Sequence, residues 1–186
     1  MAPDLKKSVN NWYIQMSEEV TVRGVESADA AALVELLNKL QSETETITID
    51  EQIPMLSVQE ESDQLELINQ SPLDQVIVAD FDGSLIGVVS LQCTDSKKAE
   101  AELGVGVLKE FWNQGLGSML VDEAIYWAQT TSRLRKLWLT VVAENAAAIH
   151  IYKRAGFEIL KAEKLQLPDG ERKNTIMMNL SVKKEF

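Results

Sequence analysis

Two glycines stand just before an apolar helical stretch, in the segment FWNQGLGSML (residues 111–120), and they could form an anion site. Glycine costs a helix roughly 0.5–1 kcal/mol relative to alanine, so Gly115 and Gly117 indicate a sharp turn or a close approach to the backbone. The first N–H groups of a helix lack intrahelical partners and lie at the positive end of its dipole. Since no Lys or Arg follows Lys109 in this loop, backbone amides would hold any phosphate. The alternative is a turn that serves packing alone.

Two familiar nucleotide-binding loops do not fit this segment. A P-loop requires the pattern G-x-x-x-x-G-K-[ST], which is absent here. The dinucleotide fingerprint requires a third glycine and a tighter turn after the strand than the spacing from Val107 to Gly115 allows. A phosphate at this turn would therefore belong to another class of ligand.

A second candidate group lies on the helix expected within NAAAIHIYKRAGF (145–157). Seven residues at about 100° each bring Tyr152 within roughly 20° of Asn145, with Ile149 on the same face, whereas His150 points elsewhere. A tyrosine with an ordinary pKa near 10 is protonated at neutral pH and could donate a proton. Asn145 is the expected helix cap, worth about 1 kcal/mol. The alternative for Tyr152 is a core residue whose hydroxyl bonds to backbone.

Two glutamates lie on a strand expected at 99–107. Alternation along a strand places Glu100, Glu102, Gly104 and Gly106 on one face, opposite the face that starts at Ala99. Two carboxylates beside two positions without side chains could line a cleft and supply a base. The alternative is a pair of solvated glutamates, and a β-bulge near the glycines would disturb the alternation.

The elements that must position these residues follow a mixed α/β order, with hairpins early and late and a strand-helix-strand-helix unit between them. They are a strand at 20–25, a helix capped by Ser27 or Asp29, a helix at about 58–69, a hairpin at 75–93 around Asp82-Gly83, a strand at 101–107, a helix ending near Thr130, a strand at 136–142 buried on both faces, a helix that Gly156 ends, and strands at 157–167 and 174–182 joined by Pro168-Asp169-Gly170. We expect the strands 101–107 and 136–142 to lie side by side.

Composition indicates one globular domain over residues 1–186, with 1–18 as an N-terminal arm that is either loose or docked by Trp12 and Tyr13. The 29 acidic residues outnumber the 18 basic ones, and the net charge of −11 argues against nucleic acid and membrane as main partners. A cationic or amine substrate suits this charge. The lone Cys93, the lack of a signal-peptide pattern and the lack of a long apolar run predict a cytoplasmic protein.

Together, the segments LKEFWNQGLGS (108–118) and NAAAIHIYKRAGF resemble the GNAT superfamily of acyl-CoA-dependent N-acetyltransferases, and the likeness extends from Val20 to about Leu180. The resemblance implies a GNAT-like fold, with a central mixed, mostly antiparallel sheet of six to seven strands, about four helices and splayed central strands. It also implies cofactor-binding residues for acetyl-CoA: main-chain pairing of the pantetheine arm along Val105, Gly106 and Val107, pyrophosphate binding by the amides of Asn113, Gln114, Gly115, Leu116, Gly117 and Ser118, and Asn145 near the thioester. Trp112 departs from the Arg or Gln usual in the family.

The chemistry that the resemblance implies is direct attack of a primary amine on the acetyl thioester in a ternary complex, without a metal. Tyr152 would be the acid, and Glu102 would be the base through a water. The acceptor would be a small molecule or a peptide or protein N-terminus, steered by an acidic segment that contains Glu43, Glu45, Asp50 and Glu51. A catalytically silent acyl-CoA-binding module and a purely structural interaction domain remain as alternatives to the enzyme, and a homodimer is one possible assembly.

Overall fold

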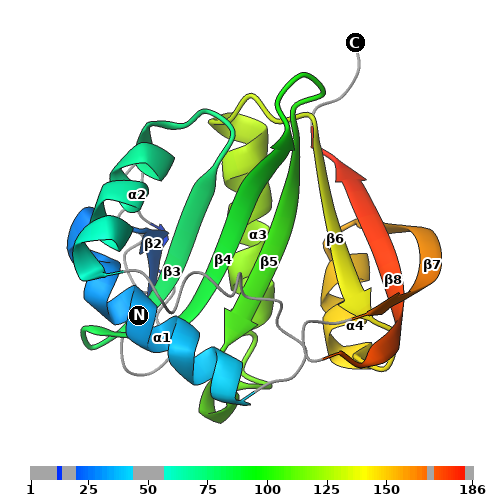
Figure 1. Ribbon diagram of the computed structural model, residues 1–186, viewed down its shortest axis with the longest axis horizontal. Coiled ribbons are helices and arrows are strands. Elements are labelled where there is room, and N and C mark those ends of the chain that lie inside the picture. The colour runs from blue at the N-terminus through cyan, green and yellow to red at the C-terminus, as the bar shows by residue number, and fades with distance from the viewer. Residues whose placement is uncertain (1–11, 14–19, 44–56, 167–169, 183–186) are drawn as a thin grey trace, which may run out of the picture.

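The computed structural model describes residues 12–13, 20–43, 57–166 and 170–182, which form one mixed sheet with helices on both of its faces (Figure 1). The strands are β1 (Trp12–Tyr13), β2 (Val20–Gly24), β3 (Gln75–Phe81), β4 (Ser84–Asp95), β5 (Glu100–Val107), β6 (Lys136–Val142), β7 (Glu158–Gln166) and β8 (Arg172–Ser181). Their order in the sheet is β1-β2-β3-β4-β5-β6-β8-β7. Every neighbouring pair is antiparallel except β5 and β6, which confirms the mixed, mostly antiparallel sheet.

Four α-helices in the described part of the chain cover the sheet. They are α1 (Ala30–Glu43), α2 (Val58–Gln70), α3 (Leu116–Thr130) and α4 (Ala146–Arg154), with short 3₁₀ turns η1 (Ser27–Asp29) and η3 (Lys109–Phe111). In Figure 1, α1 and α2 lie in front of the sheet, whereas α3 and α4 lie behind it. Helices α1 and α3 each bury an apolar stripe at helical spacing; on α3 the stripe contains Leu116, Leu120, Val121, Ala124 and Ala128. The helix boundaries lie within about two residues of those expected from the periodicity.

The two central parallel strands separate after a short region of pairing. The β5–β6 ladder contains only the pairs Glu100↔Lys136, Ala101↔Leu137 and Glu102↔Trp138. Beyond them, β5 continues to Val107 against β4, and β6 continues to Val142 against β8. The strands therefore diverge toward their carboxyl ends, as expected for splayed central strands, and leave an open edge between them.

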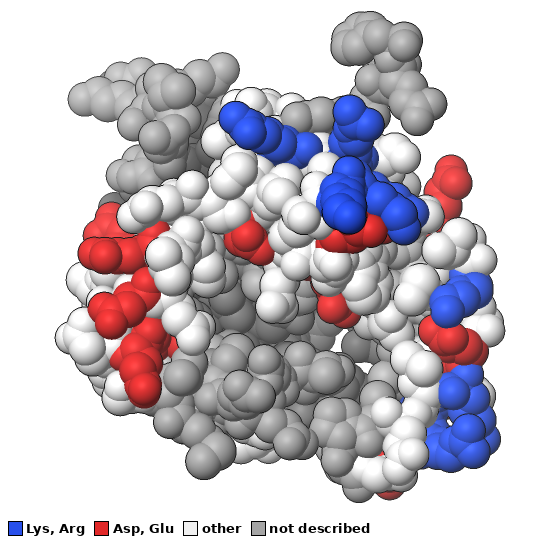
Figure 2. Space-filling model, turned by 45° about the horizontal axis from the view of Figure 1, so that its top comes forward, with Lys and Arg blue, Asp and Glu red and all other residues white. Residues whose placement is uncertain are grey.

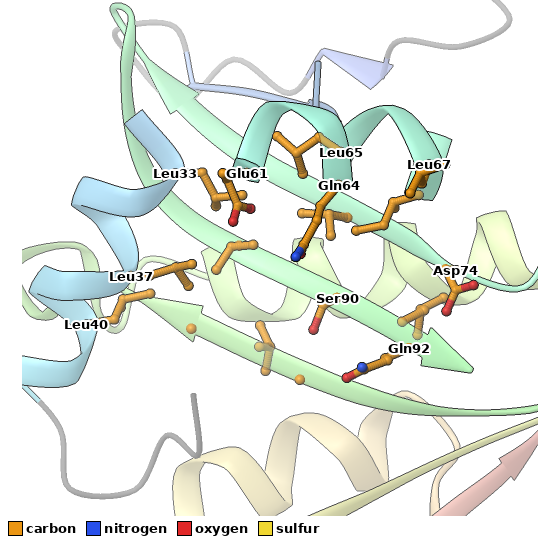
Figure 3. Close-up of a pocket in the computed structure, with 17 residues that line it drawn as sticks. Leu33, Leu37, Leu40, Glu61, Gln64, Leu65, Leu67, Asp74, Ser90 and Gln92 are labelled. Carbon is orange, nitrogen blue, oxygen red and sulfur yellow. The ribbon is translucent and has the colours of Figure 1, made fainter. Parts of the chain in front are cut away.

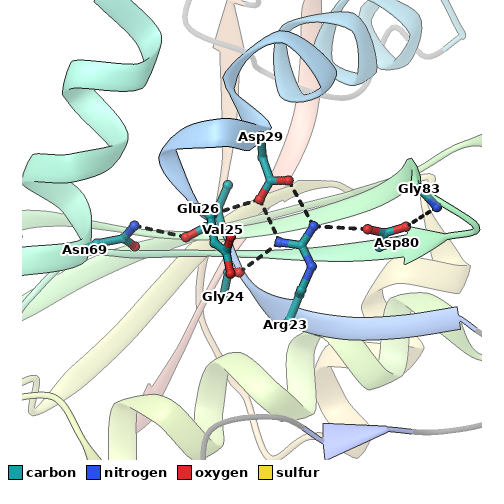
Figure 4. Close-up of polar contacts among 8 residues, drawn as sticks. All are labelled: Arg23, Gly24, Val25, Glu26, Asp29, Asn69, Asp80 and Gly83. Carbon is teal, nitrogen blue, oxygen red and sulfur yellow. Dashed lines mark hydrogen bonds and ion pairs between the residues drawn. The ribbon is translucent and has the colours of Figure 1, made fainter.

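A network around Arg23 fixes the start of α1 against the sheet (Figure 4). The guanidinium donates to both oxygens of Asp29 at 2.7 and 2.9 Å and to Asp80 at 3.0 Å. Asp29 also accepts from the backbone N–H of Glu26 at 2.8 Å, so it caps the η1 turn rather than α1 directly. The Arg23 guanidinium holds the pKa of the Asp29 carboxyl below its usual range. The network joins β2, η1 and β3.

Several sequence expectations need correction or fall outside the described residues. Ala99 is not part of β5; it adopts a left-handed turn conformation with φ of 57°. The strand at 136–142 is buried in alternation rather than on both faces, because Trp138 and Thr140 are only half-buried. The main chains of Trp12 and Tyr13 pair with β2, whereas the rest of the 1–18 arm and residues 167–169 of the last turn lie outside the described residues. None of the described helices combines the length and the apolar character needed to span a membrane.

Candidate active site

The turn before α3 exposes a run of backbone donors. Six consecutive N–H groups, from Asn113 to Ser118, donate no hydrogen bond to any residue that the structure describes. The hydrogen bonding of the helix begins only with Met119, whose N–H donates to the Gly115 carbonyl at 3.1 Å. Such a run at the positive end of a 15-residue helix can receive an anion with several acceptor oxygens.

The two positions in this turn require glycine for different physical reasons. Gly115 has φ of 83°, and a Cβ built there would meet nothing within 4 Å, so only its left-handed conformation requires glycine. Gly117 has ordinary helical geometry, but a Cβ there would lie 3.4 Å from Ile151 Cδ1 and 4.0 Å from Val107 Cγ2. The small residue thus lets α3 pack closely against α4 and β5. Asn113, with φ of 61°, adds a second left-handed position to the turn.

The open edge of β5 presents main-chain groups toward the gap left by β6. Leu108 N–H donates to the Ile86 carbonyl at 2.9 Å, which places Leu108 in the set of residues that bond to β4. In an antiparallel ladder, every second residue of a strand bonds to the same neighbouring strand. Val105 and Val107 are the residues that alternate with this set, so their N–H and C=O groups point away from β4. There the β6 ladder has already ended. One of these groups is engaged, because the Val107 carbonyl accepts from Trp112 Nε1 at 2.7 Å.

The helix after β6 carries the predicted cap and the predicted tyrosine. Asn145 Oδ1 accepts from the backbone N–H of Ala148 at 3.1 Å, as the sequence indicates for a helix cap. Tyr152 is 7% exposed and packs edge-on against Phe157, with ring centroids 5.9 Å apart. Its hydroxyl makes no hydrogen bond with the described residues, so the alternative of a backbone-bonded hydroxyl is not observed among them. Burial raises the pKa of Tyr152 to about 12.

The face of β5 that carries glutamates and glycines keeps its alternation. The register with β4 runs without a shift from Gly87↔Val107 to Cys93↔Ala101, so no bulge lies at the glycines in this ladder. Gly104 lies opposite Ser90, and a Cβ built at Gly104 would be 3.2 Å from Ser90 Oγ. The glycine therefore keeps this face of the sheet open.

The two glutamates of β5 have different environments. Glu100 forms an ion pair with Lys136, at 3.5 Å between Oε1 and Nζ, so this carboxylate is engaged across the β5–β6 ladder. Glu102 is half-buried opposite Gln92, and burial raises the pKa of its carboxyl. Of the two carboxylates, Glu100 is held in an ion pair, whereas Glu102 forms none with the described residues.

A cavity of about 470 Å³ lies between α1, α2 and the sheet (Figure 3). Leu33, Leu37 and Leu40 of α1 form an apolar wall, while Gly104 and Gly106 of β5 form part of the floor. Gln64, Ser90 and Gln92 add neutral polar groups. The cavity thus reaches from the two N-terminal helices to the strand whose far edge is open.

The sequence analysis missed the most unusual side chain of this cavity. Glu61 is 5% exposed, lines the cavity from α2, and its Oε2 has no hydrogen-bond partner among the described residues. Burial raises the pKa of its carboxyl. The spacing of residues in the sequence could have indicated this burial. Glu61 falls on one helical stripe with Leu65 and Ile68, at a position where an apolar residue is expected.

Of the four acidic residues named between the first two helices, Glu43 alone lies among the described residues. Glu43, the last residue of α1, does not stand free, because its Oε2 accepts from the backbone N–H of Lys109 at 2.8 Å. The contact ties the end of α1 to the η3 turn that precedes the amide run. Glu45, Asp50 and Glu51 lie outside the described residues.

An amide-lined turn, an open strand edge and a neighbouring cavity together have the geometry to receive an extended, phosphate-bearing molecule beside a smaller one. Residues 35–157, which contain the turn, the strand edge and all of the described cavity-lining residues except Leu33, match the family model described as Acetyltransferase (GNAT) family. The chain belongs to this family. Acetyl-CoA is therefore its acetyl donor, and its reaction is acetyl transfer to an amine.

Individual proteins resemble the chain over most of its length. L-amino acid N-acetyltransferase AaaT of Escherichia coli (strain K12) is 28% identical over 158 residues, which cover 82% of this chain and 92% of that protein. The crystal structure of a GNAT-family acetyltransferase from Streptococcus pneumoniae has a TM-score of 0.81 and 32% identity, covering 88% of this chain and 99% of that one. The structure of yncA from Salmonella typhimurium with its cofactor acetyl-CoA, at 21% identity and a TM-score of 0.75, covers 90% of this chain and 96% of that one and shares the fold.

Proposed function

We propose that the protein transfers the acetyl group of acetyl-CoA to a primary amine of a small molecule or a peptide N-terminus, by direct attack within a ternary complex. The observation that carries this proposal is the run of unpaired N–H groups from Asn113 to Ser118. A pyrophosphate presents several acceptor oxygens, which fits this donor set without a basic side chain. Bound acetyl-CoA would supply an activated acetyl thioester and a thiolate leaving group.

The open edge of β5 suits the pantetheine arm of the same cosubstrate. Val105 and Val107 direct main-chain donors and acceptors into the gap, where amide groups of the arm can pair with them as a further strand would. Asn145 would contribute by capping the helix at the end of β6, which fixes the first turn of α4 beside the gap. These contacts would orient the thioester, and orientation of two reactants can supply roughly 7–11 kcal/mol of the barrier reduction.

Tyr152 is the proposed proton donor to the departing thiolate. Its raised pKa of about 12 keeps the hydroxyl protonated at every pH at which the protein would work. Because the hydroxyl is bonded to none of the described residues, it is available to a group that enters the site. General-acid assistance of this kind is typically worth about 10²–10⁴-fold in rate.

Glu102 is the proposed base, acting on the attacking amine through a water. By alternation it shares its face of β5 with Gly104 and Gly106, and both of these line the cavity. The cavity is therefore the proposed acceptor site. Its elevated pKa places Glu102 closer to the pH range in which a base both accepts and releases a proton readily.

The experiment that tests the proposal is calorimetric titration with acetyl-CoA, followed by measurement of thiol release with a panel of primary amines. We expect saturable binding of acetyl-CoA and thiol release that depends on the amine. Binding without release on any amine would instead identify a silent acyl-CoA-binding module. Failure to bind either acetyl-CoA or CoA would overturn the role of the amide run.

A further inference from the structure

We propose that Glu61 determines acceptor specificity, by pairing with a second positive charge that the acceptor carries apart from its reacting nitrogen. The inference rests on the proposed function, because it concerns the acceptor of the same reaction. The substrate class is an amine with two ionisable nitrogens separated by an apolar spacer, such as an α,ω-diaminoalkane.

The Glu61 carboxylate is buried inside the cavity. Figure 3 shows Glu61 extending from α2 toward the space above the sheet, beside Leu33 of α1. The side chain is 95% removed from solvent, and one oxygen has no partner among the described residues. A buried, unpaired carboxylate destabilises a fold, whereas a cation brought against it satisfies both its charge and its lone pairs.

The described residues around the cavity bring no positive charge to Glu61. No Lys or Arg is among the described residues that line the cavity. The other acidic lining residue, Asp74, is satisfied, because it accepts from Ser71 Oγ at 2.6 Å and from Cys93 N–H at 2.7 Å. The described lining residues therefore provide no counter-ion for Glu61, which an incoming cation would supply.

The surface beside the cavity is also negatively charged. Helix α2 carries Glu60, Glu61, Asp63 and Glu66 and has no basic residue. In Figure 2, the flank on the side of α2 shows acidic side chains, while Lys and Arg gather on other parts of the visible face. A field of this sign raises the local concentration of cations.

The cavity has an apolar wall on α1 and an open floor on β5. Leucines 33, 37 and 40 form the α1 wall, and Gly104 and Gly106 open the floor on β5, the strand that also carries Glu102. An acceptor with one nitrogen paired to Glu61 and the reacting nitrogen beside β5 would thus place its apolar spacer against the three leucines of α1. A free α-amino acid with an apolar side chain fits less well, because it has no second cation for Glu61 and no described lining residue is a cation for its carboxylate.

The test compares α,ω-diaminoalkanes of three to eight carbons with n-alkylamines of matched length, which have the same spacer but lack the second charge. We expect the wild-type kcat/KM to favour the diamine by at least about tenfold at the best length, a typical selectivity for one buried charge pair. Glu61→Gln keeps the shape and removes the charge, so the ratio of diamine to alkylamine should fall toward one.

The matched control is Glu66→Gln, an exposed position on the same helix, which removes an equal charge without facing the cavity. It should leave the diamine preference intact, whereas a preference lost equally in both variants would show a general field effect and overturn the pairing. Glu61→Leu, which replaces the unsatisfied group by an apolar one of similar size, guards against loss of fold in the Gln variant.

Failure of this inference and failure of the proposed function give different results. Turnover of diamines and alkylamines with equal kcat/KM, or a diamine preference that survives Glu61→Gln, would overturn the role of Glu61 while the acetyltransferase stands. If no amine were turned over, calorimetry with the best-binding diamine alone would decide: binding to wild type that Glu61→Gln weakens by about tenfold supports the pairing, and equal binding refutes it.

Discussion

The Val107 carbonyl at the end of β5 accepts a hydrogen bond from the indole Nε1 of Trp112, at 2.7 Å. The bond connects the open strand edge directly to the turn that carries the unpaired amides. Lys109 Nζ lies 5.9 Å from the centre of the same indole ring and adds a cation–π contact. Trp112 thus holds the turn in place, although its position in the sequence otherwise indicates only a departure from the family pattern.

Replacing Trp112 by Phe should weaken acetyl-CoA binding. The substitution keeps an aromatic ring beside Lys109 but removes the donor to Val107, and a net hydrogen bond is worth about 0.5–1.5 kcal/mol. We therefore expect the dissociation constant for acetyl-CoA, measured by calorimetry, to rise by about 2- to 10-fold. Tighter binding would show instead that a free Val107 carbonyl serves the pantetheine arm better.

Gly115→Ala should weaken acetyl-CoA binding through backbone strain alone, because φ of 83° disfavours alanine while the space around the position is open. The expected loss of stability is roughly 1 kcal/mol. Gly83→Ala is a matched control, since Gly83 has φ of 82°, equally open surroundings and a place in the β3–β4 turn. Thermal unfolding should change alike in both variants, and only Gly115→Ala should raise the dissociation constant.

Tyr152→Phe should lower turnover by at least about tenfold, which corresponds to about 1.4 kcal/mol of transition-state stabilisation. Acetyl-CoA affinity and thermal stability should not fall, because the substitution breaks no hydrogen bond between the hydroxyl and a described residue. Steady-state kinetics and calorimetry measure the two effects separately. Tyr126→Phe, on the exposed part of α3, loses the same hydroxyl and should keep full turnover. Unchanged turnover in Tyr152→Phe would remove this residue from the acid role.

The pH dependence of turnover should report Glu102. A base acts when deprotonated, so kcat/KM should fall as the pH drops through its pKa, and burial moves this limb above the ordinary value for glutamate. An acceptor amine of low pKa, neutral throughout the range, keeps its own titration out of the profile. Glu102→Gln should reduce the rate by about 10²–10⁴-fold and flatten the limb. Glu100→Gln, which loses only the ion pair with Lys136, should retain the limb; if it did not, Glu100 would be the base.

Asp29→Asn should destabilise the protein at neutral pH by about 1–3 kcal/mol, because Arg23 would lose the charge of its main partner. The folded-state pKa of Asp29 is lowered, so its contribution is present above the unfolded value near 4 and is lost as the pH falls through the folded value. Denaturant unfolding at pH 7 and at pH 2–3 should therefore show the difference between variant and wild type shrinking on acidification. Glu35→Gln, which breaks only an exposed pair with Lys39, should barely change stability, and an equal effect of both substitutions would contradict the prediction.

Local features of the chain were read correctly from the sequence. Helical periodicity located α1 to α4, the strand at 136–142 has the predicted bounds, and the Asn145 cap was predicted from one residue and the helix that follows it. The turn at Gly115 is also a local feature, because a glycine just before an apolar helix indicates an unusual backbone conformation at that residue itself. These features depend on neighbours within a few residues, and so the order of residues was enough to find them.

Contacts between distant segments could be found only in the tertiary structure. The ion pair of Glu100 with Lys136 and the hydrogen bond from the Lys109 N–H to Glu43 each join residues that are far apart in the chain. Glu61 illustrates the difference most clearly. On α2 alone it looks like one of four acidic residues, and only the packing of α1, α2 and the sheet removes it from water without giving it a partner. The sequence by itself therefore determined the elements and the turn before α3, because short-range backbone preferences govern both, whereas the shape and charge of the cavity between α1, α2 and the sheet arise where separate elements meet and were decided by the fold.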